Sequence, residues 1–460
     1  MSTEQKNNVI YYEAYDKIEN MWTANNAVSH KFSNGKGEIE LKKNIRKIGE
    51  SAFVEEPALI SLKIPDCITE IDTEAFGYCG NLENILIGKS VKKIGVLAFF
   101  SCPRLVSVVI PDSVVKIGES AFEDCGNLKT LKIGSSLSKI GDFAFSDCCA
   151  LSSITVSEEN KKYDSRENCN AIIETASNKL VLGSNNTVVV DSVNEIGDFA
   201  FCGCRSLTSI EIPYSVTKIG TCAFKGCSGL TSLRIPDSVK EIRDQAFSLC
   251  RSLEYVSLGS NVGKIGKEIF YFCDSLELID VSRDNRKYDS RDRCNALIET
   301  ATDTLVVGSS RAFIPESVRK IGKYAFAGCG KMTSVKIPDS VREIGEYAFS
   351  TCDCLTSVKI PNSVKKMGDG VFECCDSLKA AMIPISVEKI SAGMFLCCRN
   401  LESVVLPDSV TEIGERAFLN CAELKFVMIP DSVTKIGKDA FRDCVKLSEE
   451  TQKKISEIIK

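Results

Sequence analysis

Residues 401–421 read LESVVLPDSVTEIGERAFLNC, and variants of this stretch fill most of the 460-residue chain. Its marker is Phe418, because a Phe recurs every 23 residues in three runs. The runs are Phe53, Phe76, Phe99, Phe122 and Phe145, then Phe201, Phe224, Phe247 and Phe270, then Phe326, Phe349, Phe372, Phe395, Phe418 and Phe441. A fixed period of this length is typical of stacked repeats, so the 15 copies predict one repeat architecture and not several globules.

The first half of each copy has the pattern of a short strand. Val404 and Leu406 alternate with outward residues, and Pro407 ends the strand because it has no N–H for the next ladder. One copy cannot bury its own apolar side, whereas a stack of copies buries a continuous core. The pattern therefore predicts a solenoid, α/β to mostly β, with 15 repeats of 23 residues and short parallel strands.

The second half of each copy has a different spacing. Ile413, Ala417 and Cys421 are four residues apart, which predicts one stripe of a helix-like turn. Gly414 is expected to break regular structure ahead of that turn.

Two insertions of equal length, residues 157–189 and 282–314, interrupt the register and resemble each other. The first contains YDSRENCNAIIETASNKLVLGS at 163–184, and the second contains YDSRDRCNALIETATDTLVVGS at 288–309. Alternation around Ser177-Asn178 predicts a β-hairpin that projects from the solenoid. The shared Tyr163, Asp164, Ser165 and Arg166 fit either a site motif or a loop held by the Asp and Arg side chains, and duplication alone explains their identity.

Both ends are expected to carry caps, so the predicted parts are an N-terminal hairpin cap (1–35), the solenoid (36–447) and a C-terminal capping helix (448–460). Asn34-Gly35 is a strong signal for a two-residue hairpin turn. Tyr11, Tyr12 and Trp22 are predicted to cover the open end of the core.

The C-terminal cap follows from its own pattern. Ser448 is the predicted N-cap, and the expected apolar face consists of Ile455, Ile458 and Ile459.

Composition excludes several classes of partner. The net charge is −5 with 26% charged residues, and no Lys/Arg block indicates nucleic acid. No apolar run reaches the ~18 residues of a membrane helix, so no membrane insertion is expected. The first residues lack the apolar segment of a signal peptide. We therefore expect a cytoplasmic protein, or an extracellular or cell-surface protein if a leader was removed.

Cysteine is abundant, with 23 residues, and 14 of the 15 repeat Phe residues have a Cys three positions later. The favoured interpretation is a small buried slot filled by free Cys, and the alternative is a metal array or a disulfide ladder. His30 is the only histidine, so Cys/His zinc spacing and Ser-His-Asp or Cys-His catalysis have poor prospects. No catalytic residue, cofactor or metal is predicted.

The strand face is the expected binding surface, and its outward positions lie eight and ten residues after each Phe. The first column is mostly Ser and Thr. Near the C-terminus the two columns become apolar over three successive repeats, with lysines beside them. We name these residues the apolar strip (Ala380, Met382, Val405, Phe426 and Met428) and the lysine border (Lys336 and Lys359). Adjacent exposed apolar positions predict a protein-docking surface on a monomer or weak dimer, although repeat drift, an end-cap or a neighbouring chain would also explain them.

The unit IPDSVTEIGERAFLNCAEL resembles the BspA-type, or Treponema pallidum-type, leucine-rich repeats. The insertion YDSRENCNAIIETASNKLVLGS is similar to segments of Bacteroidetes members. The resemblance implies a right-handed leucine-rich repeat solenoid and a surface or secreted binding protein, with adhesion to host matrix or other microbes attributed to some members. It transfers no catalytic residue. Three hypotheses follow: a non-enzymatic protein-binding scaffold, an exported adhesin, and an enzyme with its site in the duplicated insertions.

Overall fold

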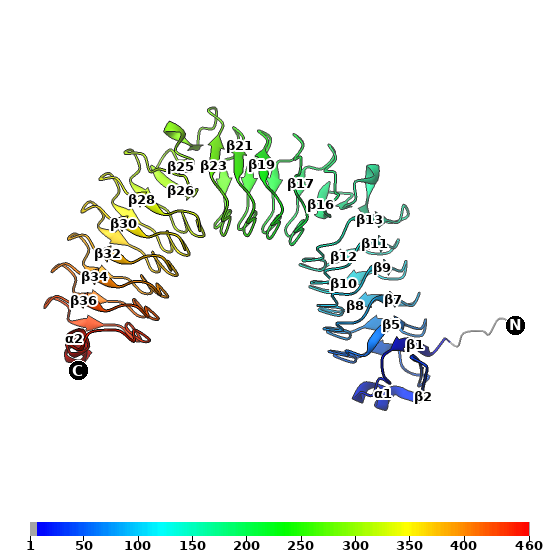
Figure 1. Cartoon of the computed structure of the whole chain (residues 1–460). Coiled ribbons are helices and arrows are strands. Elements are labelled where there is room, and N and C mark those ends of the chain that lie inside the picture. Colours follow the sequence, from blue (N-terminus) through cyan, green and yellow to red (C-terminus); the bar gives the residue numbers. More distant parts are fainter. Residues whose placement is uncertain (1–6, 460) are drawn as a thin grey trace. The chain divides into compact units, whose positions relative to one another are not determined.

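The computed structural model describes residues 7–459, which form two compact units. One comprises the described residues up to Leu230 together with Ile242–Phe247, and the other comprises Thr231–Glu241 together with the described residues from Ser248 onward. Residues 1–6 of the predicted N-terminal cap and residue 460 of the predicted helix lie outside the described range. The fold is a β-solenoid of about 17 turns of about 23 residues, and within each unit successive turns stack side by side (Figure 1).

Each repeat contributes up to two strands. On the strand face the first unit has β5 (Leu59–Lys63), β7 (Asn84–Leu86), β9 (Ser107–Ile110), β11 (Thr130–Ile133) and β13 (Ser153–Val156). The second unit has β19 (Ser232–Ile235), β21 (Tyr255–Leu258), β23 (Leu278–Val281), β28 (Ser334–Lys336), β30 (Ser357–Lys359), β32 (Ala380–Met382), β34 (Ser403–Val405) and β36 (Phe426–Met428).

Shorter strands follow at the Lys/Glu–Ile step of the repeat. They are β4 (Lys47–Ile48), β6 (Glu70–Ile71), β8 (Lys93–Ile94), β10 (Lys116–Ile117), β12 (Lys139–Ile140), β17 (Glu195–Ile196), β18 (Lys218–Ile219), β20 (Glu241–Ile242), β22 (Lys264–Ile265), β27 (Lys320–Ile321), β29 (Glu343–Ile344), β31 (Lys366–Met367), β33 (Lys389–Ile390), β35 (Glu412–Ile413) and β37 (Lys435–Ile436).

The strand register equals the sequence period. In the parallel pair β9 and β11, Val108 lies beside Leu131 and both are buried, while Val109 and Lys132 are outward. A one-residue shift would turn every apolar side chain toward solvent, so the 23-residue spacing fixes the register. The predicted solenoid with short parallel strands is confirmed.

The segment around each Phe is not the helix-like turn that the spacing predicts. Arg416 and Asn420, two residues before and after Phe418, both have left-handed φ angles, of 53° and 61°. The Phe418 N–H donates to the Ala440 carbonyl of the next turn at 2.8 Å. The Phe418 and Phe441 rings stack with centroids 5.0 Å apart, whereas an α-helix is about 10 Å wide. The distance between neighbouring repeats is therefore too short for a helix. The backbone instead forms a tight turn that hydrogen-bonds to the next repeat.

Gly414 has a different role from the predicted helix breaker. A Cβ at this position would lie 2.7 Å from the Ala392 N and 2.8 Å from the Ile390 O of the preceding turn. The glycine suits this position because two backbones approach closely here, although Asp72, Arg243 and Ser391 occupy the same position in three other repeats.

The left-handed residues should carry measurable strain. Arg416 is exposed and its φ is 53°, so Arg416→Gly is expected to raise the free energy of unfolding by about 0.5–1 kcal/mol in urea denaturation. Arg416→Ala is the matched control, because it removes the same side chain but keeps the Cβ. Equal unfolding midpoints for the two variants would show that the backbone is not strained at this position.

The repeat cysteines form a second ladder beside the Phe ladder. The Cys421 thiol donates to the Phe395 carbonyl of the preceding turn at 3.1 Å, and the same bond recurs from Cys79 to Phe53 at 3.1 Å. All 14 repeat cysteines are buried, and no cysteine within residues 7–459 forms a disulfide. The interpretation of Cys as the filler of a small buried slot is confirmed, and the slot also provides a donor for a buried carbonyl.

Thiol labelling tests this ladder within one peptide. Cys354 is exposed, while Cys352 is fully buried, and burial raises the pKa of the Cys352 thiol well above its usual range. Because the thiolate is the reacting form, iodoacetamide should modify Cys354 in the folded protein and leave Cys352 unmodified until urea is added. Mass spectrometry with fragmentation locates the label. Equal labelling of both thiols without urea would contradict the buried ladder.

Each insertion forms a turn of the stack and not a projecting hairpin. The first consists of β14 (Tyr163–Asp164), η1 (Arg166–Asn168), β15 (Ile172–Glu174) and β16 (Lys179–Leu182), and the second of β24 (Tyr288–Asp289), η2 (Arg291–Arg293), β25 (Ala296–Glu299) and β26 (Thr304–Gly308). β15 and β16 pair as the predicted hairpin, but β16 also pairs in parallel with β17, and Ile173 and Leu180 are fully buried. The hairpin prediction is confirmed, and the prediction that it projects is wrong, because both faces of the hairpin carry residues that must be buried.

Glycine replaces the repeat Phe in the extra turn. The Gly183 N–H donates to the Ala200 carbonyl at 2.7 Å, as the Phe201 N–H donates to the Ala223 carbonyl. A Cβ on Gly183 would lie 2.1 Å from the Phe201 ring. The missing side chain leaves space for that ring.

The N-terminal residues cover the first turn. They form β1 (Val9–Ala14), α1 (Met21–Asn26), β2 (Ala27–Ser33) and β3 (Lys36–Leu41), and β2 and β3 pair across the predicted Asn34-Gly35 turn. Trp22 packs on Phe53 with ring centroids 5.5 Å apart, and Tyr12 is buried. Tyr11 does not cover the core, since alternation on β1 turns it to the strand face, where Lys63 lies over its ring.

The C-terminal helix α2 (Glu449–Ile459) caps the last turn as predicted. The Ser448 hydroxyl accepts from the Thr451 N–H at 3.3 Å. Ile455 and Ile458 pack on the core, but Ile459 is exposed, so the predicted apolar face is wrong at its last residue.

Candidate functional site

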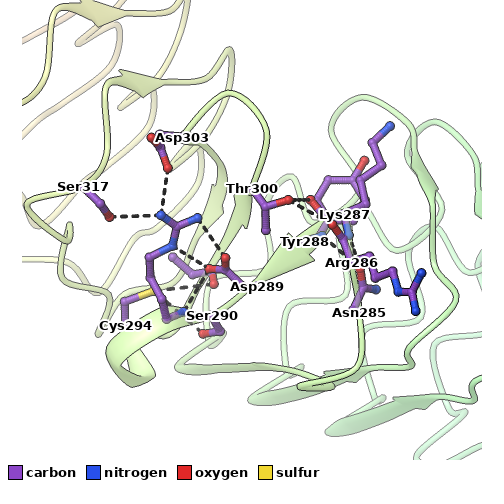
Figure 2. Close-up of polar contacts among 12 residues, drawn as sticks. Asn285, Arg286, Lys287, Tyr288, Asp289, Ser290, Cys294, Thr300, Asp303 and Ser317 are labelled. Atoms are coloured by element: carbon purple, nitrogen blue, oxygen red, sulfur yellow. Dashed lines mark hydrogen bonds and ion pairs between the residues drawn. The ribbon is translucent and has the colours of Figure 1, made fainter.

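The duplicated Tyr-Asp-Ser-Arg motif has structural contacts in both copies. Arg166 donates to both carboxylate oxygens of Asp164, at 2.8 and 2.6 Å, and to Asn178 at 3.0 Å. In the second copy Arg291 bonds Asp289 and Asp303, and hydrogen bonding to Asp289 raises the pKa of Arg291 (Figure 2). The interpretation as a loop held by Asp and Arg side chains is confirmed.

The other two residues of the motif also face the protein. Tyr163 is buried, burial raises its pKa, and its hydroxyl donates to the Ser138 carbonyl at 3.4 Å. The Ser165 hydroxyl donates to the Ile154 carbonyl at 3.2 Å. The motif therefore fixes the insertion on the preceding turn.

A buried asparagine, which the sequence analysis did not identify, joins each insertion to the stack. Asn285 donates to the Gly259 and Val262 carbonyls at 3.0 and 3.1 Å. It accepts from the Lys287 and Tyr288 N–H groups, both at 2.9 Å (Figure 2). Asn160 makes the same four bonds in the first insertion. The only sequence signal is an Asn three residues before the shared Tyr in both copies.

A hollow of about 220 Å³ lies beside the first insertion, lined in part by Asp142, Glu174, Lys179 and Asp198. Glu174 is ion-paired with Lys162, and Lys179 lies 3.3 Å from Glu195. Glu174 and Lys179 therefore each have a partner of opposite charge within the first unit.

The structure brings the apolar strip together on one face. In the parallel sheet β32-β34-β36, Met382, Val405 and Met428 are direct neighbours in register. Their exposed fractions are 69%, 43% and 53%. Phe426 is 40% exposed and aligns with Ser403 and Ala380 in the first column. Every residue of the strip lies outward, as the register predicts, whereas a binding role stays a prediction.

The lysine border continues the second column. Lys336 and Lys359 are neighbours on β28 and β30, and both are exposed. Lys336 reaches Glu316 only at 4.0 Å with both side chains largely in solvent, so this pair is weak. Lys359 has no ion-pair partner among residues 7–459.

At the other end of the strip a hollow of about 360 Å³ separates β36 from α2. Phe426 and Met428 line one side, and Glu450, Lys453 and Glu457 line the helix side. The strip therefore ends in a concave region.

A second apolar pair on the strand face was missed. Leu86 and Val109 occupy the second column of the first unit, with exposed fractions of 62% and 52%. They lie ten residues after Phe76 and Phe99, so the same register rule would have identified them. A hollow of about 400 Å³ borders Leu86, Lys63 and Tyr11.

These features define a class of protein: a β-solenoid built from a short repeat, with an exposed strand face. The charged side chains of the Tyr-Asp-Ser-Arg loops form ion pairs within the protein. The family model for the BspA type leucine rich repeat region matches residues 29–119, 93–174, 182–296 and 319–448. The chain belongs to the BspA-type leucine-rich repeat family.

Three solved structures of bacterial leucine-rich repeat proteins are similar to this chain. A leucine rich cell surface protein of Faecalibacterium prausnitzii is 26% identical, with 92% of this chain and 84% of that chain covered and a TM-score of 0.44. A leucine-rich repeat protein of Bacteroides ovatus is 24% identical, with coverages of 91% and 90% and a TM-score of 0.34. One of Eubacterium ventriosum is 19% identical, with coverages of 96% and 90% and a TM-score of 0.44. No curated protein matches the chain.

No helix within residues 7–459 is long and apolar enough to cross a membrane.

Proposed function

We propose that this protein is a non-enzymatic scaffold that binds a protein partner through the apolar strip. The observation that carries the proposal is the in-register column Met382, Val405 and Met428, exposed on three adjacent strands. Adjacent exposed apolar side chains on a repeat protein are costly in water unless a partner covers them. Methionine side chains are flexible and polarizable, which suits contact with an apolar partner surface.

The test compares capture by the intact protein with capture by a triple variant, Met382→Ser, Phe426→Ser and Met428→Ser. We expect proteins that cross-link to residues of the strip, identified by cross-linking mass spectrometry, and at least about a tenfold loss of their capture by the variant. The matched control removes exposed apolar side chains elsewhere, with Val188→Ser, Tyr214→Ser and Val445→Ser. Capture that the control loses as much as the triple variant does would contradict a role for the strip.

An exported adhesin is the second candidate, and it follows from membership of the family. The same strand face would serve this function, so localisation separates the two. Protease treatment of intact cells should digest an adhesin and leave a cytoplasmic scaffold whole.

A further inference from the structure

Along the second outward column of the C-terminal turns, basic residues are followed by apolar residues. From β28 to β36 it reads Lys336, Lys359, Met382, Val405 and Met428. Two exposed ammonium groups are thus followed by three exposed apolar side chains on successive parallel strands. With strands about 4.8 Å apart, the five positions span about 19 Å along the stack.

From this column we infer that the partner presents an amphipathic α-helix whose axis runs along the stack. The inference rests on the proposed function and adds the conformation and chemistry of the partner. Side chains at i, i+3, i+7, i+10 and i+14 lie on one face of a helix and span about 21 Å, close to the spacing of the five turns. Five same-face side chains of an extended peptide would span about 27 Å and lose register with the column.

The first outward column gives such a helix space to approach. Ser334, Ser357 and Ala380 are small and exposed beside the larger side chains of the second column. A helix is about 10 Å wide, so it extends over both columns, and small residues in one of them allow close packing. Phe426 and the hollow beside α2, whose helix side carries Glu450, Lys453 and Glu457, lie at the end of this path.

The positive charges of Lys336 and Lys359 indicate which end of the partner helix carries its acidic residues. Carboxylates opposite Lys336 and Lys359 complement the ammonium groups, which have weak or no ion pairs among the described residues. Acidic residues stabilise a helix at its N-terminal turns. The partner helix therefore has acidic residues at i and i+3, apolar residues at i+7, i+10 and i+14, and its N-terminus toward Lys336.

Synthetic peptides on an Ala/Gln framework test this inference with the intact protein. The ordered peptide has Glu at i and i+3 and Leu at i+7, i+10 and i+14. The interleaved control has the same composition, with Leu at i, i+7 and i+14 and Glu at i+3 and i+10, so that neither direction matches the column. Fluorescence anisotropy measures affinity, and circular dichroism measures the helix formed on binding.

The ordered peptide is expected to bind at least about tenfold more tightly than the interleaved peptide and to gain helix on binding. Lys336→Glu with Lys359→Glu should reverse the charge preference, so that an ordered peptide with Lys in place of Glu binds best. Equal affinity of the ordered and interleaved peptides, or binding without helix formation, would overturn the helix inference. So would concentration-dependent dimerisation abolished by the triple Ser variant, because the occupant would then be a second copy of the chain.

The two proposals can fail separately. If the triple variant loses its captured proteins but the peptides show no preference, the partner binds the strip in another conformation and only the helix inference fails. If capture is unchanged in the triple variant, the strip is not the docking surface and the proposed function fails at this site.

Discussion

Phe349→Ala is expected to lower the free energy of unfolding by about 4–5 kcal/mol, the largest effect of any single substitution considered for this protein. Phe349 is fully buried and stacks on Phe326 at 5.1 Å and on Phe372 at 5.6 Å, with the rings nearly parallel. Removing the ring leaves a cavity that the turns cannot close, because their spacing is fixed by the strand ladders on the other sides. It also removes two stacking interactions.

The effect should extend to cooperativity. Each turn of a solenoid contacts its neighbours, so a weakened turn reduces coupling between the segments on its two sides. Urea denaturation followed by circular dichroism should show a lower midpoint and a broader or split transition in Phe349→Ala. Phe313→Ala is the matched control, since that ring is 48% exposed, and it should change stability by less than about 1 kcal/mol. Similar losses in the two variants would show that the buried ladder does not dominate stability.

Asn285→Ala is expected to destabilise the second unit by about 3–4 kcal/mol. The substitution leaves the Gly259 and Val262 carbonyls and two N–H groups of the insertion without their partner, and each buried unsatisfied group costs about 1–3 kcal/mol, less where water enters. Hydrogen exchange should show faster exchange at the Lys287 and Tyr288 amides than in the unsubstituted protein.

A matched control tests whether burial is the reason. Asn261 also donates to a backbone carbonyl, that of Asp237 at 2.8 Å, but this bond is exposed. Asn261→Ala should therefore change the unfolding midpoint by less than about 1 kcal/mol. If both variants lose the same stability, the four bonds of Asn285 do not hold the insertion on the stack.

The sequence predicted the candidate surface well, because outward and inward positions follow from a fixed period. Met382, Val405 and Met428 could be placed in one column by counting ten residues from each Phe. The same rule places Leu86 and Val109 in this column, between Lys63 and Lys132. Ile459 and Tyr11 were misplaced, since packing at the ends of a stack does not follow the repeat period.

By itself the sequence determined the solenoid, its register and its cysteine slot, because each depends on residues a constant number of positions apart. Only the tertiary structure decided what lies between turns. The structure has a turn with left-handed residues around Phe418 in place of the expected helical turn, and a close approach of two backbones at Gly414. It also places the insertions within the stack, where Asn160 and Asn285 bond to the preceding turn. The physical reason is that these features depend on the distance of about 5 Å between neighbouring turns, which no single repeat specifies.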